Sequence, residues 1–349
     1  MMASQTATID QRQVSTATPN TSVLRRITHY PNFGLVMAFL GILVLAAILT
    51  PSMFTVFSIT NMLRNNAAFA FLAVGVMFVI LTGGIDLSIA STMGLAGIVT
   101  TSLMSDNPTV PAFVWLLLGI GIGALCGAFN GFIVGYLKII PMIATLGTMY
   151  IFRGLAFVVS DGRWWFPHQF TDSYANLAVG RTMGLFNVVW IAVIVFILAG
   201  LFLGFTSPGR RFYAVGTNSE SASISGIRLP RTKFLAFTLC GALAGMAGML
   251  YTATYSIASS SIGTGFEMTA IAICILGGVS ITGGKGRIDG VIIAFLMMSV
   301  ITLFISLLPG LSVWQNAIQG AIIVGAVALS VFTNRSAIRN ALRERGALI

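Results

Sequence analysis

Charged side chains are scarce in this chain of 349 residues, and their scarcity excludes a soluble globular domain. Only 8% of the residues are Asp, Glu, Lys or Arg, and 56% are hydrophobic, whereas soluble domains carry about 25% charged residues. Histidine occurs twice and cysteine three times, with the cysteines inside apolar runs. This set forms no metal-site spacing, no catalytic triad and no disulfide framework. We therefore expect a polytopic membrane protein with no catalytic residues and no bound metal.

The sequence also lacks a nucleotide-binding loop. A phosphate loop needs a glycine six positions before its lysine and a Ser or Thr after it, but Val279 precedes Lys285 at that distance and Gly286 follows it. If the activity costs energy, a partner ATPase must bind the ATP and Mg²⁺, and we expect no cofactor on this chain. The net charge of +10 does not indicate nucleic acid, because the basic residues lie in loops between apolar runs.

Apolar runs long enough to cross a bilayer recur along the chain. A helix needs about 20 apolar residues to cross about 30 Å of hydrocarbon. This rule predicts an all-α integral membrane protein with about ten transmembrane helices. The predicted spans are 33–50, 62–81, 86–104, 112–136, 140–160, 184–206, 233–255, 266–283, 288–308 and 313–333.

The distribution of basic residues orients these spans. With the N-terminus inside, 15 of the 19 Lys and Arg residues fall on the cytoplasmic side, as the positive-inside rule requires. The four on the outer side are Arg64, Arg153, Arg163 and Arg181. We therefore expect both termini in the cytoplasm, with residues 1–32 a disordered tail, 33–334 a single transmembrane domain and 335–349 a basic tail.

Opposite orientation of two blocks of helices predicts an inverted repeat. The block formed by the second to fifth spans begins outside, whereas the block formed by the seventh to tenth begins inside. A short turn after the second span, 82–86 (TGGID), matches a glycine-rich turn after the eighth, 283–287 (GGKGR). Inverted repeats are a common transporter architecture, with the pathway at the repeat interface.

A polar loop, residues 207–232, interrupts the apolar chain and includes a short-helix signature. Thr217-Asn-Ser-Glu220 is a predicted capping box, in which the Thr hydroxyl accepts from the N3 amide and the Glu reaches back to the N-cap amide. Gly226 supplies a left-handed stop and Pro230 prevents continuation. The loop is either a solvated connection or a helix that a cytoplasmic partner grips.

Glycines recur every fourth residue in the span 112–136 and form one stripe on a helix. They are Gly119, Gly123, Gly127, Gly131 and Gly135. Small residues let two backbones approach closely in lipid, so we expect this stripe to be a helix-packing face.

Few polar residues lie in or near the spans, and these are the candidates for a substrate pathway. They are Asn65, Asn66, Asp86, Ser88, Asn130, Thr145 and Glu267. Polar groups at membrane depth are functional candidates, although Asp86 or Ser88 could equally cap the helix that follows. Charge inside the bundle is nearly absent, which favours a neutral substrate such as a sugar or polyol.

The longest outer loop, about 161–183, contains Trp164 and Trp165. Interfacial tryptophans usually anchor a protein at the membrane surface. The alternative is a docking surface for a partner outside the cytoplasm.

Several stretches resemble the permease subunits of bacterial ABC importers for monosaccharides of the ribose, xylose and galactose type. They are 82–91 (TGGIDLSIAS), 130–131 (NG), 143–147 (IATLG), 153–154 (RG), 216–222 (GTNSESA), 225–227 (SGI) and 277–286 (GGVSITGGKG). The resemblance covers residues 33–334.

This resemblance implies a set of partners and a location. It implies a bacterial inner-membrane protein with a second permease, either a copy or a paralogue, two cytoplasmic ATPase domains and a periplasmic sugar-binding protein. It also implies that the helix after Thr217 is the coupling helix that contacts the ATPase, through Glu220, Ala222 and Gly226. Ser221 stands where this importer class usually has an alanine.

A self-sufficient, ion-coupled secondary transporter is the rival interpretation. It fits ten spans and inverted repeats, but it should have carboxylates or a titrating relay at mid-membrane depth. Asp86 and Glu267 both lie near predicted span ends, so the importer is the favoured hypothesis.

Overall fold

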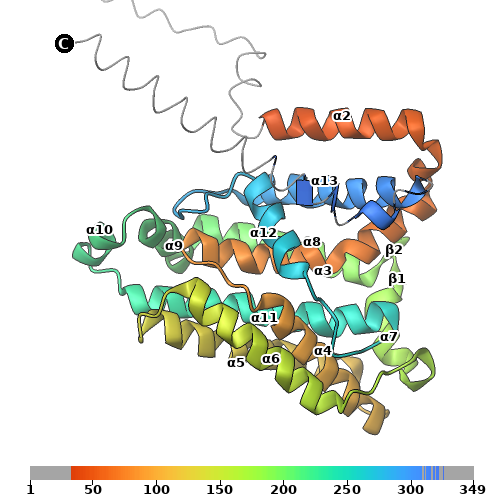
Figure 1. Ribbon diagram of the computed structural model, residues 1–349, viewed down its shortest axis with the longest axis horizontal. Helices are drawn as coiled ribbons and strands as arrows, with labels where there is room; N and C mark the ends of the chain where they lie inside the picture. Colours follow the sequence, from red (N-terminus) through yellow and green to blue (C-terminus); the bar gives the residue numbers. More distant parts are fainter. Residues whose placement is uncertain are drawn as a thin grey trace, which may run out of the picture.

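The computed structural model describes residues 33–308 and scattered positions between 310 and 325, and it is built of helices (Figure 1). The longer helices are α2 (Phe33–Leu49), α3 (Val56–Leu81), α4 (Ile89–Asp106), α5 (Ala112–Gly135), α6 (Pro141–Ser160), α8 (Asn187–Phe205), α11 (Leu229–Tyr255) and α13 (Ile288–Leu307). The shorter elements are η1 (Pro51–Phe54), η2 (Pro167–Gln169), α7 (Asp172–Val179), the hairpin β1 (Arg181–Thr182) and β2 (Leu185–Phe186), α9 (Ser207–Thr217), α10 (Ser219–Ile224), α12 (Phe266–Leu276) and η3 (Ser312–Trp314).

Six helices in the described part of the chain are long and apolar enough to cross a membrane. They are α3, α5, α6, α8, α11 and α13. The predicted all-helical fold is therefore confirmed. The count of ten spans and the cytoplasmic placement of both termini stay predictions, because both tails and most of the predicted span 313–333 lie outside the described residues.

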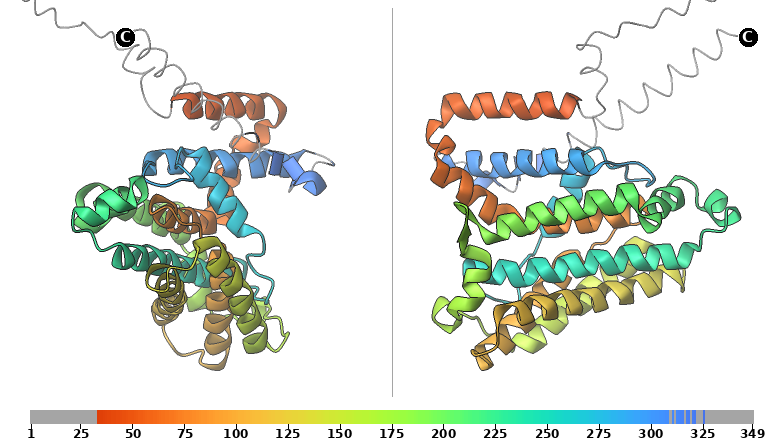
Figure 2. Two further views of the ribbon diagram at one scale, coloured as in Figure 1. Left: turned by 60° about the vertical axis from the view of Figure 1, so that its left-hand side comes forward. Right: turned by 180° about the vertical axis from the view of Figure 1, so that it is seen from behind.

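Helix α11 occupies the centre of the bundle and packs against α3, α4 and α5. Figures 1 and 2 show α11 and α5 running side by side over most of their length. The glycine stripe of α5 makes this approach possible: a Cβ on Gly123 would overlap the carbonyl oxygen of Gly241, and one on Gly131 would lie 2.8 Å from the Cα of Phe234. Backbone therefore meets backbone along this seam, as small residues allow in a membrane.

The predicted span 266–283 is wrong in its second half. Helix α12 ends at Leu276, and its 11 residues cover only about 16 Å at 1.5 Å per residue. The N–H of Gly278 donates to Ile275 O and that of Val279 to Cys274 O, while Gly278 has φ +79°. This is a Schellman stop. The prediction failed because hydropathy cannot distinguish a buried glycine-rich turn from a helix. Figure 1 shows the short α12 crossing the direction of the long helices.

The two glycine-rich linkers that follow α3 and α12 meet in the structure. The N–H of Gly284 donates to Leu81 O at 3.1 Å, and a Cβ on Gly283 would lie 2.8 Å from the N of Gly83. The predicted turns 82–86 and 283–287 are thus direct neighbours. Their contact brings together segments about 200 residues apart in sequence.

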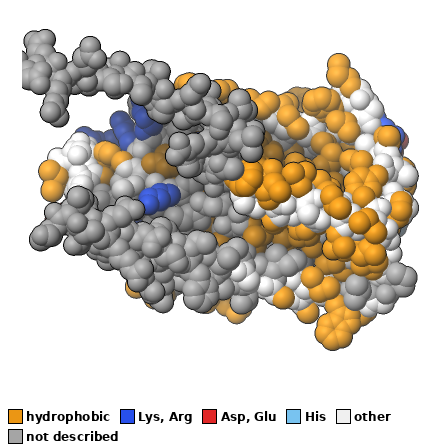
Figure 3. Space-filling view, turned by 90° about the horizontal axis from the view of Figure 1, so that it is seen from above, with side chains coloured by type: hydrophobic (Ala, Val, Ile, Leu, Met, Phe, Trp, Pro, Cys, Tyr) orange, Lys and Arg blue, Asp and Glu red, His pale blue; other side chains and the backbone are white. Residues whose placement is uncertain are grey.

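Basic side chains gather at one end of the molecule. Figure 3 shows most of the visible Lys and Arg side chains at the end that carries α9 and α10, beside a largely hydrophobic surface. Arg64 and Arg181 lie at the opposite end, where both stack on the ring of Phe186. This is the asymmetry that the sequence predicts for two sides of a membrane.

Candidate functional site

Helix α10 projects from the basic end on the loop between α9 and α11 (Figures 1 and 2). Its six residues include one buried side chain, Ala222, whereas Glu220 and Ser221 are exposed. A two-turn helix held by one small apolar contact leaves its outer face free. This geometry suits a surface that another protein grips.

The predicted capping box at Thr217 is wrong by one residue. Asn218 is the N-cap, and its Oδ1 accepts from the N–H of Ser221 at 2.9 Å. Thr217 is the last residue of α9, and its hydroxyl donates to Tyr213 O at 2.8 Å. Because α9 continues through Thr217, that residue has helical backbone and cannot adopt the extended conformation of an N-cap.

The predicted stop at Gly226 is present. Gly226 has φ +81°, its N–H donates to Ser223 O, and the N–H of Ile227 donates to Ala222 O. These two hydrogen bonds form a Schellman motif, in which the left-handed residue favours glycine. Both ends of α10 are therefore tied by local hydrogen bonds.

Helix α9 joins α10 to the two glycine-rich linkers. A Cβ on Gly216 would overlap the carbonyl oxygen of Leu81, at the end of α3, and would crowd Gly284. The Tyr213 hydroxyl donates to Gly286 O at 3.1 Å, and burial raises the pKa of this hydroxyl, which keeps it protonated as a donor. Helix α9 therefore contacts both linkers directly.

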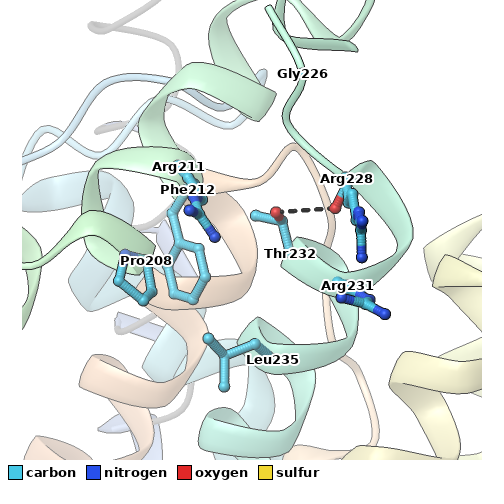
Figure 4. Close-up of a pocket in the computed structure, with 8 residues that line it drawn as sticks. All are labelled: Pro208, Arg211, Phe212, Gly226, Arg228, Arg231, Thr232 and Leu235. Atoms are coloured by element: carbon cyan, nitrogen blue, oxygen red, sulfur yellow. Dashed lines mark hydrogen bonds between the residues drawn. The ribbon is translucent and has the colours of Figure 1, made fainter.

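A cavity of about 350 Å³ lies between α9 and the start of α11. Figure 4 shows Arg211 on the α9 side of it, and Arg228 and Arg231 on the opposite side, at the N-cap and in the first turn of α11. Phe212 and Leu235 form its apolar floor. Among the described residues, none that lines it is acidic.

Four predicted pathway residues lie together in the core, around the linker between α3 and α4. Oδ1 of Asp86 accepts from the N–H of Ser88 at 2.8 Å and from its hydroxyl at 2.7 Å. Asn130 donates to the Ser88 hydroxyl at 2.7 Å. The Thr145 hydroxyl accepts from the N–H of Leu87 at 3.1 Å, so α5 and α6 both hold this linker.

The predicted capping of α4 by the Asp86 or Ser88 side chain is wrong: Ser88 is the N-cap residue, but its side chain makes no capping hydrogen bond. Asp86 instead accepts from Ser88 itself, before the first turn of the helix. Asp86 is 1% exposed and Asn130 is fully buried. Oδ1 of Asn130 has no hydrogen-bond partner among the described residues. The cluster is closed to solvent in this conformation.

The other predicted pathway residues lie elsewhere. Asn66 is buried and donates to Met62 O within its own helix, while Asn65 accepts from Arg64. They belong to the end of α3 that faces the β hairpin. Glu267 lines a separate cavity of about 380 Å³ together with Arg153 and Tyr150.

Sequence reasoning overlooked Arg153 as a site residue. Its guanidinium donates to Ser260 O at 2.9 Å and to Ile262 O at 2.6 Å, and so holds the segment before α12. The available signal was a basic residue within the apolar span 140–160, where ionisable groups are functional candidates. Arg153, Glu267, Ser260 and Ser261 line this cavity and supply polar groups that can hydrogen-bond to a hydroxylated ligand.

The two tryptophans of the loop 161–183 lie in different environments. Trp164 is exposed, whereas Trp165 is buried and exchanges two backbone hydrogen bonds with Ala258. Trp165 therefore ties this loop to the segment before α12, and only Trp164 could anchor at a membrane surface.

The sequence matches the model of a known protein family. Residues 58–327 match the family described as "Branched-chain amino acid transport system / permease component". That match covers more than half of the chain. The chain belongs to this family of transport permeases.

Curated relatives agree with this membership. The chain is 36% identical over 296 residues to the ribose import permease protein RbsC of Escherichia coli (strain K12). The aligned region covers 83% of this chain and 91% of that protein. It is 35% identical over 294 residues to RbsC of Bacillus subtilis (strain 168), with coverage of 83% and 91%. It is 32% identical over 292 residues to the autoinducer 2 import system permease protein LsrC of Klebsiella pneumoniae, with 84% of each covered. No solved structure matches.

The resemblance to permease subunits of bacterial monosaccharide ABC importers is thereby confirmed. The permease role in an importer follows from this membership, and the relatives give no support to an ion-coupled secondary transporter.

Proposed function

We propose that this permease translocates a monosaccharide or a similar small neutral polyol into a bacterial cytoplasm, across the inner membrane, by alternating access. A separate ATPase supplies the energy, a periplasmic sugar-binding protein delivers the substrate, and a second permease, a copy or a paralogue, completes the pathway. The named substrates of the relatives, ribose and autoinducer 2, and the scarcity of charge in the bundle favour a neutral hydroxylated substrate.

The contact of Gly216 with both linkers carries the mechanistic part of the proposal. The ATPase would grip α10 through Glu220 and Ala222, with Ser221 in place of the usual alanine. Because α9 packs directly on Leu81 and Gly284, motion of α10 would shift the linker that holds Asp86. ATP binding and hydrolysis would then open and close the core.

The substrate would pass between the cavity of Arg153 and Glu267 and the cluster of Asp86, Ser88, Asn130 and Thr145. Arg153 would act as a latch, because it holds two carbonyl groups of the segment before α12. Asn65 and Asn66 would serve α3 rather than the pathway, since their side-chain hydrogen bonds stay within that helix.

Affinity purification of the tagged chain from its native membrane tests the proposal, with mass spectrometry of the proteins that accompany it. We expect a stoichiometric ATPase carrying a phosphate loop. Purification of the permease alone, with sugar uptake that follows a proton or sodium gradient and ignores ATP, would contradict the importer role.

Charge reversal on α10 tests the coupling role separately. Glu220→Lys should abolish ATP-driven uptake and recovery of the ATPase, because it reverses the only acidic charge of this helix. Arg210→Gln on α9 removes a charge from the same loop and should leave uptake within about two-fold, since an exposed surface change costs within about 0.5 kcal/mol. Normal uptake by a correctly inserted Glu220→Lys permease would show that α10 does not couple to the ATPase.

A further inference from the structure

A second basic cavity adjoins the first at the start of α11. Its volume is about 850 Å³, within the range of about 300–1,000 Å³ that is common for small-ligand sites. It lies between the α5–α6 connection and the first turn of α11, and it shares Gly226, Arg228 and Arg231 with the cavity of Figure 4. Both cavities therefore lie beside the N-terminus of α11.

Positive charge dominates both cavities. The cations that line them are Lys138, Arg211, Arg228, Arg231 and Lys233. None of the five forms a salt bridge within the described part of the chain, and no acidic residue lines either cavity. Several cations that line adjoining cavities repel one another, and a bound anion relieves this repulsion. Arginine binds phosphate through two parallel hydrogen bonds.

One wall of the larger cavity is apolar and faces outward from the bundle. Ile139 is 42% exposed and Ile140 is 61% exposed, and both line the cavity beside Lys138. Exposed isoleucines at the end of a membrane-spanning helix indicate contact with hydrocarbon, whereas the arginines require water or an anion. An apolar outer wall beside a cationic lining is the combination that the boundary between lipid tails and head groups would favour.

We propose that this cavity binds the phosphate head group of an anionic phospholipid from the cytoplasmic leaflet, with the lipid tails along Ile139 and Ile140. The side of the membrane rests on the proposed orientation of loop 207–232. Basic pockets between helices on the cytoplasmic side bind acidic lipid head groups by the same chemistry. The lipid would neutralise Arg228 and Arg231, which lie two and five residues after Gly226, and so stabilise the connection between α10 and α11.

Native mass spectrometry of the purified full-length permease tests this site without any transport assay. The detergent-solubilised protein is titrated with phosphatidylglycerol and, separately, with phosphatidylcholine. Arg228→Gln/Arg231→Gln removes two cavity charges. Arg210→Gln/Lys285→Gln is the matched control, because it removes two exposed charges from the same end that line neither cavity.

We expect phosphatidylglycerol to bind more tightly than phosphatidylcholine. The cavity variant should bind phosphatidylglycerol about 30-fold more weakly, from about 1 kcal/mol per basic residue and 1.4 kcal/mol per factor of ten. The control variant should bind it like the parent protein. If the double variant does not fold, each single substitution should weaken binding about five-fold on the same reckoning.

Four results would overturn the lipid assignment. Equal loss in both double variants would reveal a general charge effect, and equal binding of the two lipids would remove the role of lipid charge. Displacement of the lipid by inorganic phosphate would assign the cavity to a free anion. Loss of ATPase capture with unchanged lipid binding would assign the arginines to protein docking. None of these results depends on import, so failure here is distinguishable from failure of the proposed function.

Discussion

Alanine at position 123 should destabilise this permease, although Gly→Ala normally favours a helix. A methyl group on Gly123 would overlap the carbonyl oxygen of Gly241 and would lie 2.6 Å from the N and 2.7 Å from the Cα of Gly245. All three atoms belong to the backbone of α11. No side-chain rotation can relieve the overlap, so α5 and α11 must move apart.

The expected cost follows from that separation. A gap of 0.5–1 Å forfeits about a quarter to a half of each van der Waals contact along the seam, and overpacking of a close-packed interface costs about 1–3 kcal/mol. We expect Gly123→Ala to lower the free energy of unfolding by about 3 kcal/mol, the upper end of that range. Gly121→Ala is the matched control, because no atom lies within 4 Å of its Cβ position and alanine is favoured over glycine in a helix by about 0.8–1 kcal/mol.

Reversible unfolding in mixed micelles, followed by tryptophan fluorescence as the mole fraction of dodecyl sulfate rises, measures both variants. The two substitutions add the same methyl group to the same helix, two residues apart, yet their effects on the free energy of unfolding should have opposite signs. Equal stability of the two variants would refute the conclusion that backbone contact at the α5–α11 seam holds the bundle together.

Three further changes test other contacts. Asn218→Ala should remove the N-cap of α10, cost about 0.5–2 kcal/mol of local stability and speed amide exchange in 219–224; unchanged exchange would contradict the cap. Tyr213→Phe should lose the hydrogen bond to Gly286 O, at a cost of about 0.5–1.5 kcal/mol in the same unfolding assay, and a neutral result would show that α9 does not depend on it. Asp86→Ala should lower the free energy of unfolding by about 1–3 kcal/mol, because it leaves the buried N–H of Ser88 without its acceptor. Asp86→Asn keeps an acceptor oxygen and should lower it less, and equal losses in the same unfolding assay would contradict this role of Asp86.

Local patterns in the sequence predicted the elements whose causes are local. Long apolar runs predicted the helices, since a membrane-spanning helix satisfies its own backbone. The left-handed stop at Gly226 was equally predictable, because few other residues tolerate φ near +81° there. The N-cap was missed by one residue, because Thr217 and Asn218 are both good caps and only the length of α9 decides between them.

The short helix α12 could not be predicted from hydropathy. Residues 277–283 are apolar enough to continue a helix, but Gly277 packs against the backbone of Gly290 and Val291. That contact exists only when α13 folds back, so it leaves no mark on the hydrophobicity of 266–283. The same limit applies to Arg153, whose carbonyl partners lie 107 and 109 residues away.

Composition and spacing alone determined that this chain is a helical membrane protein and which face of the helix 112–136 carries the small residues. Each of these properties belongs to a single segment in water or lipid. Tertiary structure decided the rest. It chose α11 as the partner of the glycine stripe, gathered Asp86, Ser88, Asn130 and Thr145 from three segments, and placed Gly216 against two linkers. Such contacts join residues 40 to 200 positions apart, and they form only where close packing of the whole bundle leaves room for one arrangement.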